Sequence, residues 1–210
     1  MIGALAQTAK GTVLTATQRG IATVRYVFDK NASRFTVQAF ATGMLSAFGH
    51  NPMIGIRDFA GEVQFVADTY EQAALSLTID TTTFEVLDEM KRDERAKLQQ
   101  AMNDDVLDVT HHPKATFVSK QITVQKVSAE LLQAKVTGDL RLRGNTQNQS
   151  FDARVTLLRA MLRISGDFTI RQSDFGIKLV SFAGGALRLK DDLKLTFELV
   201  ARQNDSPASA

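Results

Sequence analysis

Alternation of apolar and polar residues with a period of two dominates the chain. In residues 132–143 the even positions are apolar or glycine, and the odd positions are polar. Residues 162–171 repeat the pattern, and Leu195, Phe197, Leu199 and Ala201 continue it near the C-terminus. A strand sends successive side chains to opposite faces, so the pattern predicts strands with one buried face. Such strands need a second apolar surface, which a two-sheet sandwich or a closed barrel supplies.

Shorter alternating runs raise the number of candidate strands to about nine. They lie at residues 24–28, 35–39, 63–65, 75–79, 115–124 and 151–155. The tetrapeptide Arg143-Gly144-Asn145-Thr146 is typical of a hairpin loop. Short connections favour antiparallel pairing, because parallel pairing needs crossover helices. We therefore expect an all-β domain of antiparallel strands.

Two segments depart from this period. Residues 87–102 are charged and rich in helix formers, and their apolar positions fall near one stripe, which predicts an amphipathic helix laid on a sheet or barrel mouth. Residues 43–58 contain several glycines and Pro52, so a short irregular or helical segment is expected there. We expect an N-terminal extension over 1–22, a single domain over 23–202 and a flexible tail over 203–210.

Composition narrows the classes of function. The chain has 13 Phe, 2 Tyr and no Trp, whereas recognition of sugars or bases usually needs aromatics with a polar edge. The net charge is +2 and no run of Lys and Arg exceeds two, so no nucleic-acid partner is expected. The absence of cysteine excludes disulfides and thiolate chemistry. With neither a long apolar run nor a basic leader, we expect no transmembrane segment and a cytoplasmic location.

Signals for catalysis and metal binding are weak. The chain has no Gly-x-Ser-x-Gly elbow, and the adjacent His111 and His112 point apart, so we expect neither a metal nor another cofactor. His50, in a glycine-flanked loop, is a candidate for the polar rim of a cavity. Arg171 and Asp174, at the end of an alternating run, are candidates for the same rim. Alternatively, Arg171 and Asp174 pair with each other and fix a loop.

Several segments, taken in order, resemble the YceI-like family of bacterial proteins. They include Phe48-Gly49-His50-Asn51 and Arg171-Gln172-Ser173-Asp174-Phe175-Gly176, with further matches at residues 26–29, 33–37, 59–63, 91–94, 104–109, 112–117 and 136–144. The resemblance covers residues 23–202. It implies a lipocalin-like, eight-stranded antiparallel β-barrel with a helix and a hydrophobic tunnel that binds a long-chain isoprenoid or similar lipid. It also implies a homodimer. Many relatives are periplasmic and begin with a Trp-containing strand, where this chain has Tyr26.

The residues themselves support the same hypothesis, which is non-catalytic binding of a long apolar ligand for carriage or storage. The inward faces of the strands are expected to line the binding site, through Phe35, Val37, Phe65, Leu77, Ile79, Phe117, Val136, Leu140, Phe168, Ile170 and Phe197. Gly138 and Gly166 lie in the same inward rows and favour space for a ligand. Two alternatives stay open: a barrel-scaffold enzyme, hydrolytic or metal-dependent, centred on His50, and a stress-related interaction protein.

Overall fold

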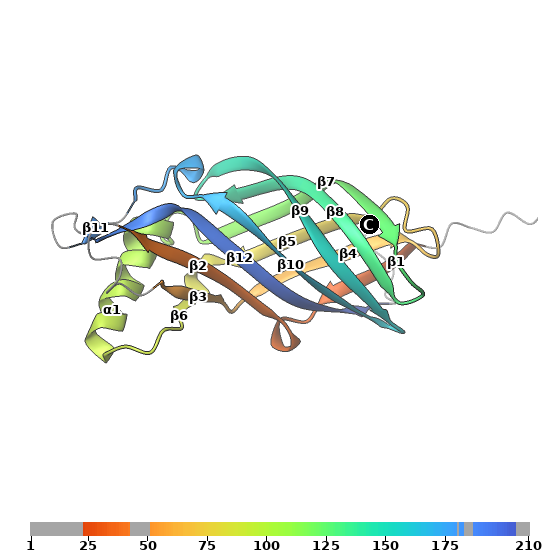
Figure 1. Ribbon diagram of the computed structural model, residues 1–210, viewed down its shortest axis with the longest axis horizontal. Helices are drawn as coiled ribbons and strands as arrows, with labels where there is room; N and C mark the ends of the chain where they lie inside the picture. The colour runs from red at the N-terminus through yellow and green to blue at the C-terminus, as the bar shows by residue number, and fades with distance from the viewer. Residues whose placement is uncertain (1–22, 43–50, 180, 183–186, 205–210) are drawn as a thin grey trace, which may run out of the picture.

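The alternating runs form antiparallel strands in the computed structural model, which describes residues 23–42, 51–179, 181–182 and 187–204 (Figure 1). The all-β, antiparallel class expected from the sequence is confirmed. The hairpin turn at Arg143 and Gly144 is confirmed too, since Leu142 pairs with Asn145 and both turn residues have positive φ, as in a type I′ hairpin loop. The strands are β1 (Thr23–Phe28), β2 (Arg34–Thr42), β3 (Met53–Ile56), β4 (Phe59–Val66), β5 (Ala74–Asp80), β6 (Phe84–Val86), β7 (Lys114–Lys126), β8 (Leu131–Leu142), β9 (Asn145–Leu158), β10 (Met161–Arg171), β11 (Ser181–Phe182) and β12 (Leu187–Gln203).

Eight of these strands close into a barrel. The ring runs β1, β4, β5, β7, β8, β9, β10 and β12, and it closes because β1 pairs with both β4 and β12. Along β8 the even positions are buried, while the odd positions are exposed or half-buried. The predicted inward rows therefore form the core. Eight strands leave an interior wide enough for packed side chains or one small ligand.

Three neighbouring strands break at the same level. The 3₁₀ turn η1 (Lys30–Ala32) separates β1 from β2, residues 57–58 separate β4 from β3, and the 3₁₀ turn η2 (Thr81–Thr83) separates β5 from β6. On one side of the break, β1, β4 and β5 belong to the closed ring. On the other side, β2, β3 and β6 extend from β12, and β6 pairs with β3 alone among the described strands. The barrel is thus closed at one end and open between β6 and β7 at the other.

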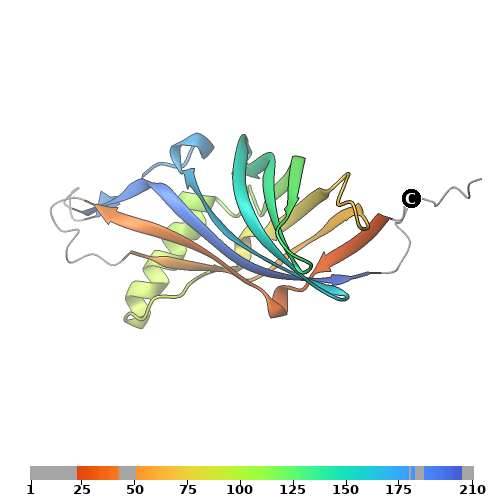
Figure 2. The ribbon, with the colours of Figure 1, turned by 45° about the vertical axis from the view of Figure 1, so that its right-hand side comes forward.

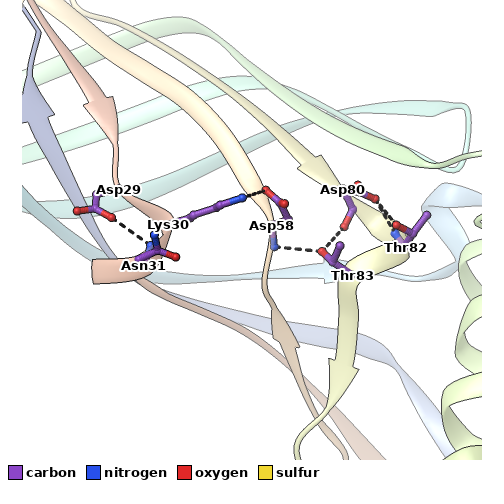
Figure 3. Close-up of polar contacts among 7 residues, drawn as sticks. All are labelled: Asp29, Lys30, Asn31, Asp58, Asp80, Thr82 and Thr83. Carbon is purple, nitrogen blue, oxygen red and sulfur yellow. Dashed lines mark hydrogen bonds and ion pairs between the residues drawn. The ribbon is translucent and has the colours of Figure 1, made fainter.

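A line of polar contacts, here the polar seam, crosses the three breaks (Figure 3). Asp29 caps η1, and Lys30 Nζ lies 2.7 Å from the Asp58 carboxylate. The Asp58 N–H donates to Thr83 Oγ1 over 3.0 Å, and that hydroxyl donates to the Asp80 carbonyl over 2.8 Å. The Asp29 cap and the two hydrogen bonds of Thr83 satisfy backbone groups at the breaks, and the Lys30–Asp58 ion pair joins two of the breaks through side chains.

Helix α1 (Arg92–Ala101) and the π-helical turn η3 (Met102–Leu107) lie at the open end. Figure 2 shows α1 beside the ends of the strands, at the left of the barrel. The Gln99 side chain serves the free edge of β6: its Nε2 donates to the Phe84 carbonyl over 2.7 Å, and its Oε1 accepts from the Val86 N–H over 3.0 Å. A single carboxamide therefore takes the place of a missing strand at this edge. No helix in the described ranges is long and apolar enough to cross a membrane.

Three predicted boundaries were wrong. The helix begins at Arg92 instead of residue 87, because the Leu87 N–H donates to the Met53 carbonyl and thereby extends the sheet. Residues 53–56 form β3 where an irregular or helical segment was expected, because pairing with β2 and β6 supplies the stability that local sequence does not. Residues 43–50 lie outside the described ranges. Gln203, expected in the flexible tail, still belongs to β12.

Candidate ligand-binding site

Three apolar cavities follow one another inside the barrel. The helix-end cavity, of about 120 Å³, lies under α1 and η3. The middle cavity, of about 80 Å³, shares Ile79, Leu140 and Leu195 with it. The far cavity, of about 70 Å³, shares Val136 and Ala153, among others, with the middle cavity. An apolar cavity of about 150 Å³ stays dry and binds benzene, so the helix-end cavity approaches the size that holds such a group, while the middle and far cavities have about half that volume. The row as a whole is suited to an elongated apolar group.

Every residue predicted to line the site borders one of the cavities. Successive side chains along a strand point to opposite faces of the sheet, so the residues that face the barrel interior could be predicted from the sequence. Contact of these residues with a ligand stays a prediction. Val37, Ile79, Leu140 and Ile170 border the helix-end cavity; Phe35, Leu77, Phe117, Val136, Phe168 and Phe197 border the middle cavity; Phe65 borders the far cavity.

Five phenylalanines form an aromatic belt around the middle cavity. Phe151 stacks on Phe168, with ring centroids 4.8 Å apart, and meets Phe197 edge-on at 5.7 Å. Phe117 lies 5.6 Å from Phe151, and Phe35 lies 6.2 Å from Phe197. Offset-stacked and edge-to-face geometries are the favoured ones for aromatic pairs. The belt fills part of the barrel interior between the helix-end and far cavities.

Gly138 and Gly166 make room for this belt. A Cβ built on Gly138 would lie 2.6 Å from Phe117 Cζ, and one built on Gly166 would lie 2.7 Å from Phe197 Cζ. Both distances are far below van der Waals contact. The expectation that these glycines leave space for a ligand was therefore wrong, because phenylalanine rings occupy that space.

The predicted polar rim is not assembled as expected in the described part of the site. Arg171 and Asp174 are exposed, border none of the three cavities and do not pair with each other. Arg171 Nε instead lies 3.9 Å from the Asp192 carboxylate. The turn η4 (Ser173–Phe175) is held by Asp191, which accepts hydrogen bonds from the side chain and backbone of Ser173. These bonds lower the pKa of the Asp191 carboxyl.

The histidines do not converge where they are described. His50 lies outside the described ranges. His111 is exposed, and its Nδ1 lies 2.7 Å from the Asp108 carboxylate, a hydrogen bond that lowers the pKa of Asp108. The His112 ring packs against Gly144, where an added Cβ would lie 3.1 Å from its Cε1. Within the described ranges, no group of three or more His, Asp or Glu side chains is arranged to hold a metal ion.

Comparison with known families decides the identity of the fold. The family model for the YceI-like domain matches residues 26–201. The chain belongs to the YceI-like family. The resemblance inferred from the ordered segments is confirmed by this match, which spans all eight strands of the ring.

Solved structures share this YceI-like fold at low sequence identity. BcnA from Burkholderia cenocepacia is 20% identical with a TM-score of 0.63, over 82% of this chain and 98% of BcnA. A polyisoprenoid binding domain from Saccharophagus degradans, implicated in plant cell wall breakdown, is 14% identical with a TM-score of 0.63, over 85% of this chain and 98% of that domain. The Campylobacter jejuni YCEI protein is 21% identical with a TM-score of 0.55, over 72% and 85% of the two chains. A search of curated proteins returned no match.

Several residues that close the YceI-like barrel were missed by sequence reasoning. Leu98 on α1 and Met102, the first residue of the π-helical turn, lie on the predicted apolar stripe of residues 87–102 and border the helix-end cavity. Val106 and Leu107, at the end of the π-helical turn, border this cavity as well and were missed. The π-helical turn departs from the 3.6-residue period, so an apolar stripe drawn for an α-helix stops short of the last two. Gln172 borders the same cavity and is 2% exposed. It stands among the polar residues of the Arg171–Asp174 segment, where no alternation marks it as buried.

Proposed function

We propose that the chain binds a long apolar ligand, isoprenoid or fatty-acid-like, in the row of cavities and serves in its carriage or storage. The observation that carries the proposal is the row itself, in which three apolar cavities share walls along one barrel. The Saccharophagus degradans domain of the same fold, described as polyisoprenoid binding, supports it.

The chemistry of the lining favours affinity from apolar burial. Apart from Gln172 and Tyr70, the described residues that border the cavities are apolar. Removing apolar surface from water contributes about 25 cal/mol per Å², or about 0.8 kcal/mol per buried carbon. A chain that fills successive cavities therefore gains affinity with each segment buried, without a polar anchor along its length.

Native mass spectrometry of the purified chain tests the proposal, combined with organic extraction of whatever it carries. We expect a stoichiometric apolar adduct, or, after extraction, uptake of geranylgeraniol or palmitic acid. Protein that is purified free of such molecules and takes up neither one would overturn the proposal. An activity that depends on bound metal and is lost in His50→Ala would favour the enzyme alternative instead.

A further inference from the structure

One polar side chain, Gln172, borders the otherwise apolar helix-end cavity. It follows the last residue of β10, and its side chain is 2% exposed. Of the described side chains that border this cavity, all the others are apolar. A buried amide without hydrogen-bond partners lowers the stability of the fold. The hydrogen bonds of Gln172 therefore indicate the role of this side chain.

The structure accounts for part of the hydrogen-bonding capacity of Gln172. Its Nε2 donates to the Lys190 carbonyl over 2.8 Å. Lys190 lies where the register between β12 and β2 shifts, between Leu189 and Leu193, so this carbonyl has no partner in the ladder with β2. A carbonyl can only accept, which assigns Nε2 to this side of the carboxamide and leaves Oε1 on the other.

Oε1 of Gln172 receives no hydrogen bond from any described residue. In the described ranges, Arg95 Nε is the one polar side-chain atom that is fully buried without a hydrogen-bond partner. Oε1 of Gln172 is therefore not fully enclosed by protein atoms. Gln172 is almost fully buried and borders the helix-end cavity, which makes the cavity wall the place where Oε1 can be exposed. The cavity therefore contains one unused hydrogen-bond acceptor.

The surroundings of Oε1 discriminate between its possible partners. A buried water usually makes two to four hydrogen bonds, and the described lining offers no second polar side chain to hold one. A carboxylate or phosphate head would bury its charge among lining residues that include no Lys, Arg or His. A neutral hydroxyl at the end of an apolar chain buries no charge and needs no second polar side chain. It donates one hydrogen bond to Oε1, and its chain occupies the apolar space.

We propose that Gln172 Oε1 accepts a hydrogen bond from the hydroxyl group of a neutral long-chain alcohol, whose chain runs from the helix-end cavity toward the middle cavity. The inference rests on the proposed function and specifies the head group of its ligand. Gln172 is then the residue that selects an alcohol over an ether, a hydrocarbon or an anion of the same chain.

The test compares geranylgeraniol with geranylgeranyl methyl ether, which keeps the oxygen and the chain but cannot donate. Each compound displaces diphenylhexatriene from the delipidated full chain, from Gln172→Met and from the matched control Gln133→Met. Gln133 is exposed on β8, so its substitution changes the outer wall alone. We compare the ratio of the two dissociation constants within each protein. This ratio removes differences among the three proteins in their affinity for the hydrocarbon chain that both compounds share.

We expect the preference for the alcohol over the ether to fall by about 3- to 10-fold in Gln172→Met, the value of one neutral hydrogen bond, and to be unchanged in Gln133→Met. An equal ratio in all three proteins, with both compounds bound, overturns the role of Gln172 and leaves the proposed function standing. Gln172 would then serve only as the partner of the Lys190 carbonyl.

The wild-type chain decides the matter if Gln172→Met does not fold. In that case, tighter binding of the alcohol than of the ether supports the inference, because the alcohol loses more hydration on entering the cavity. Binding of the ether as tightly as the alcohol overturns it. If neither compound displaces the probe, the inference fails, and the proposed function fails as well when palmitic acid is not taken up either.

Discussion

Replacing Ala153 by leucine should stop a ligand chain at the junction between the middle and far cavities. Ala153 lies on β9, is 4% exposed and borders both cavities. Its neighbours across the sheet are Ala134 on β8 and Gly166 on β10, so small residues occupy this level of the wall. A leucine side chain at position 153 would extend from this wall into the junction that the middle and far cavities share.

The expected magnitude follows from the apolar surface lost at the far cavity. At about 0.8 kcal/mol per buried carbon, one isoprene unit contributes about 4 kcal/mol, or about a thousandfold in Kd. Ordering of the added segment reduces this gain. We therefore expect affinity to rise with chain length in the wild-type protein until the far cavity is filled. In Ala153→Leu the gain from the units that reach the far cavity should fall to less than about tenfold.

Displacement of diphenylhexatriene by farnesol, geranylgeraniol and solanesol measures this dependence on chain length. Ala60→Leu is the matched control, because Ala60 is exposed on β4. Circular dichroism and thermal unfolding establish that both variants fold, since overpacking at Ala153 costs about 1–3 kcal/mol of stability. A folded Ala153→Leu protein with the same chain-length dependence as the wild type would show that the ligand does not pass this junction.

Three further outcomes are expected. Gln99→Leu should lower the free energy of unfolding by about 1–3 kcal/mol in urea titrations, because β6 loses the two hydrogen bonds that its edge receives from this side chain. Gly138→Ala should lower the Tm by several degrees in calorimetry, since the new Cβ would overlap the Val118 carbonyl oxygen on β7. The hydrogen bond from Arg202 lowers the pKa of Asp29 below 3.8, so its contribution to stability is complete above that pH and is lost as the pH falls through the lowered pKa. Asp29→Asn should therefore flatten the decline of unfolding free energy at acid pH.

Each of these outcomes has its own check. Gln100→Leu, on the exposed side of α1, should leave the urea midpoint unchanged, and an equal loss in both variants would assign the effect to helix propensity instead of the β6 edge. An unchanged Tm in Gly138→Ala would mean that the Phe117 ring and the neighbouring backbone shift without cost. A steeper acid decline in Asp29→Asn than in the wild type would contradict the sign of the pKa change.

The predictable part of this molecule is the part that strand geometry controls. Because parity along a strand selects a face, residues such as Phe117 on β7 and Leu140 on β8 could be assigned to the interior from sequence alone. The turn at Gly144 could be assigned as well, since glycine adopts positive φ readily and stands between two runs of strand residues.

The parts that could not be predicted depend on contacts between distant segments. Strand β3 exists because β2 and β6 flank it, and Leu87 leaves the helix because Met53 lies opposite. The burial of Gln172 follows from a register shift in β12, a strand that begins after the turn in which the glutamine lies. No periodicity in the residues around position 172 carries that information.

The polar seam separates two halves of the barrel that differ in how their backbone amides are protected. In the closed half every strand of the ring has a hydrogen-bonded neighbour on both sides. Beyond the seam, one side of β6 depends on the carboxamide of Gln99, a single side chain on a ten-residue helix. Local opening free energies follow the number of such contacts, so the amide of Val86 should exchange with deuterium well before those of β8 and β9. The gap between β6 and β7 can then open by a local fluctuation, at a cost below that of global unfolding, while the closed ring keeps its fold.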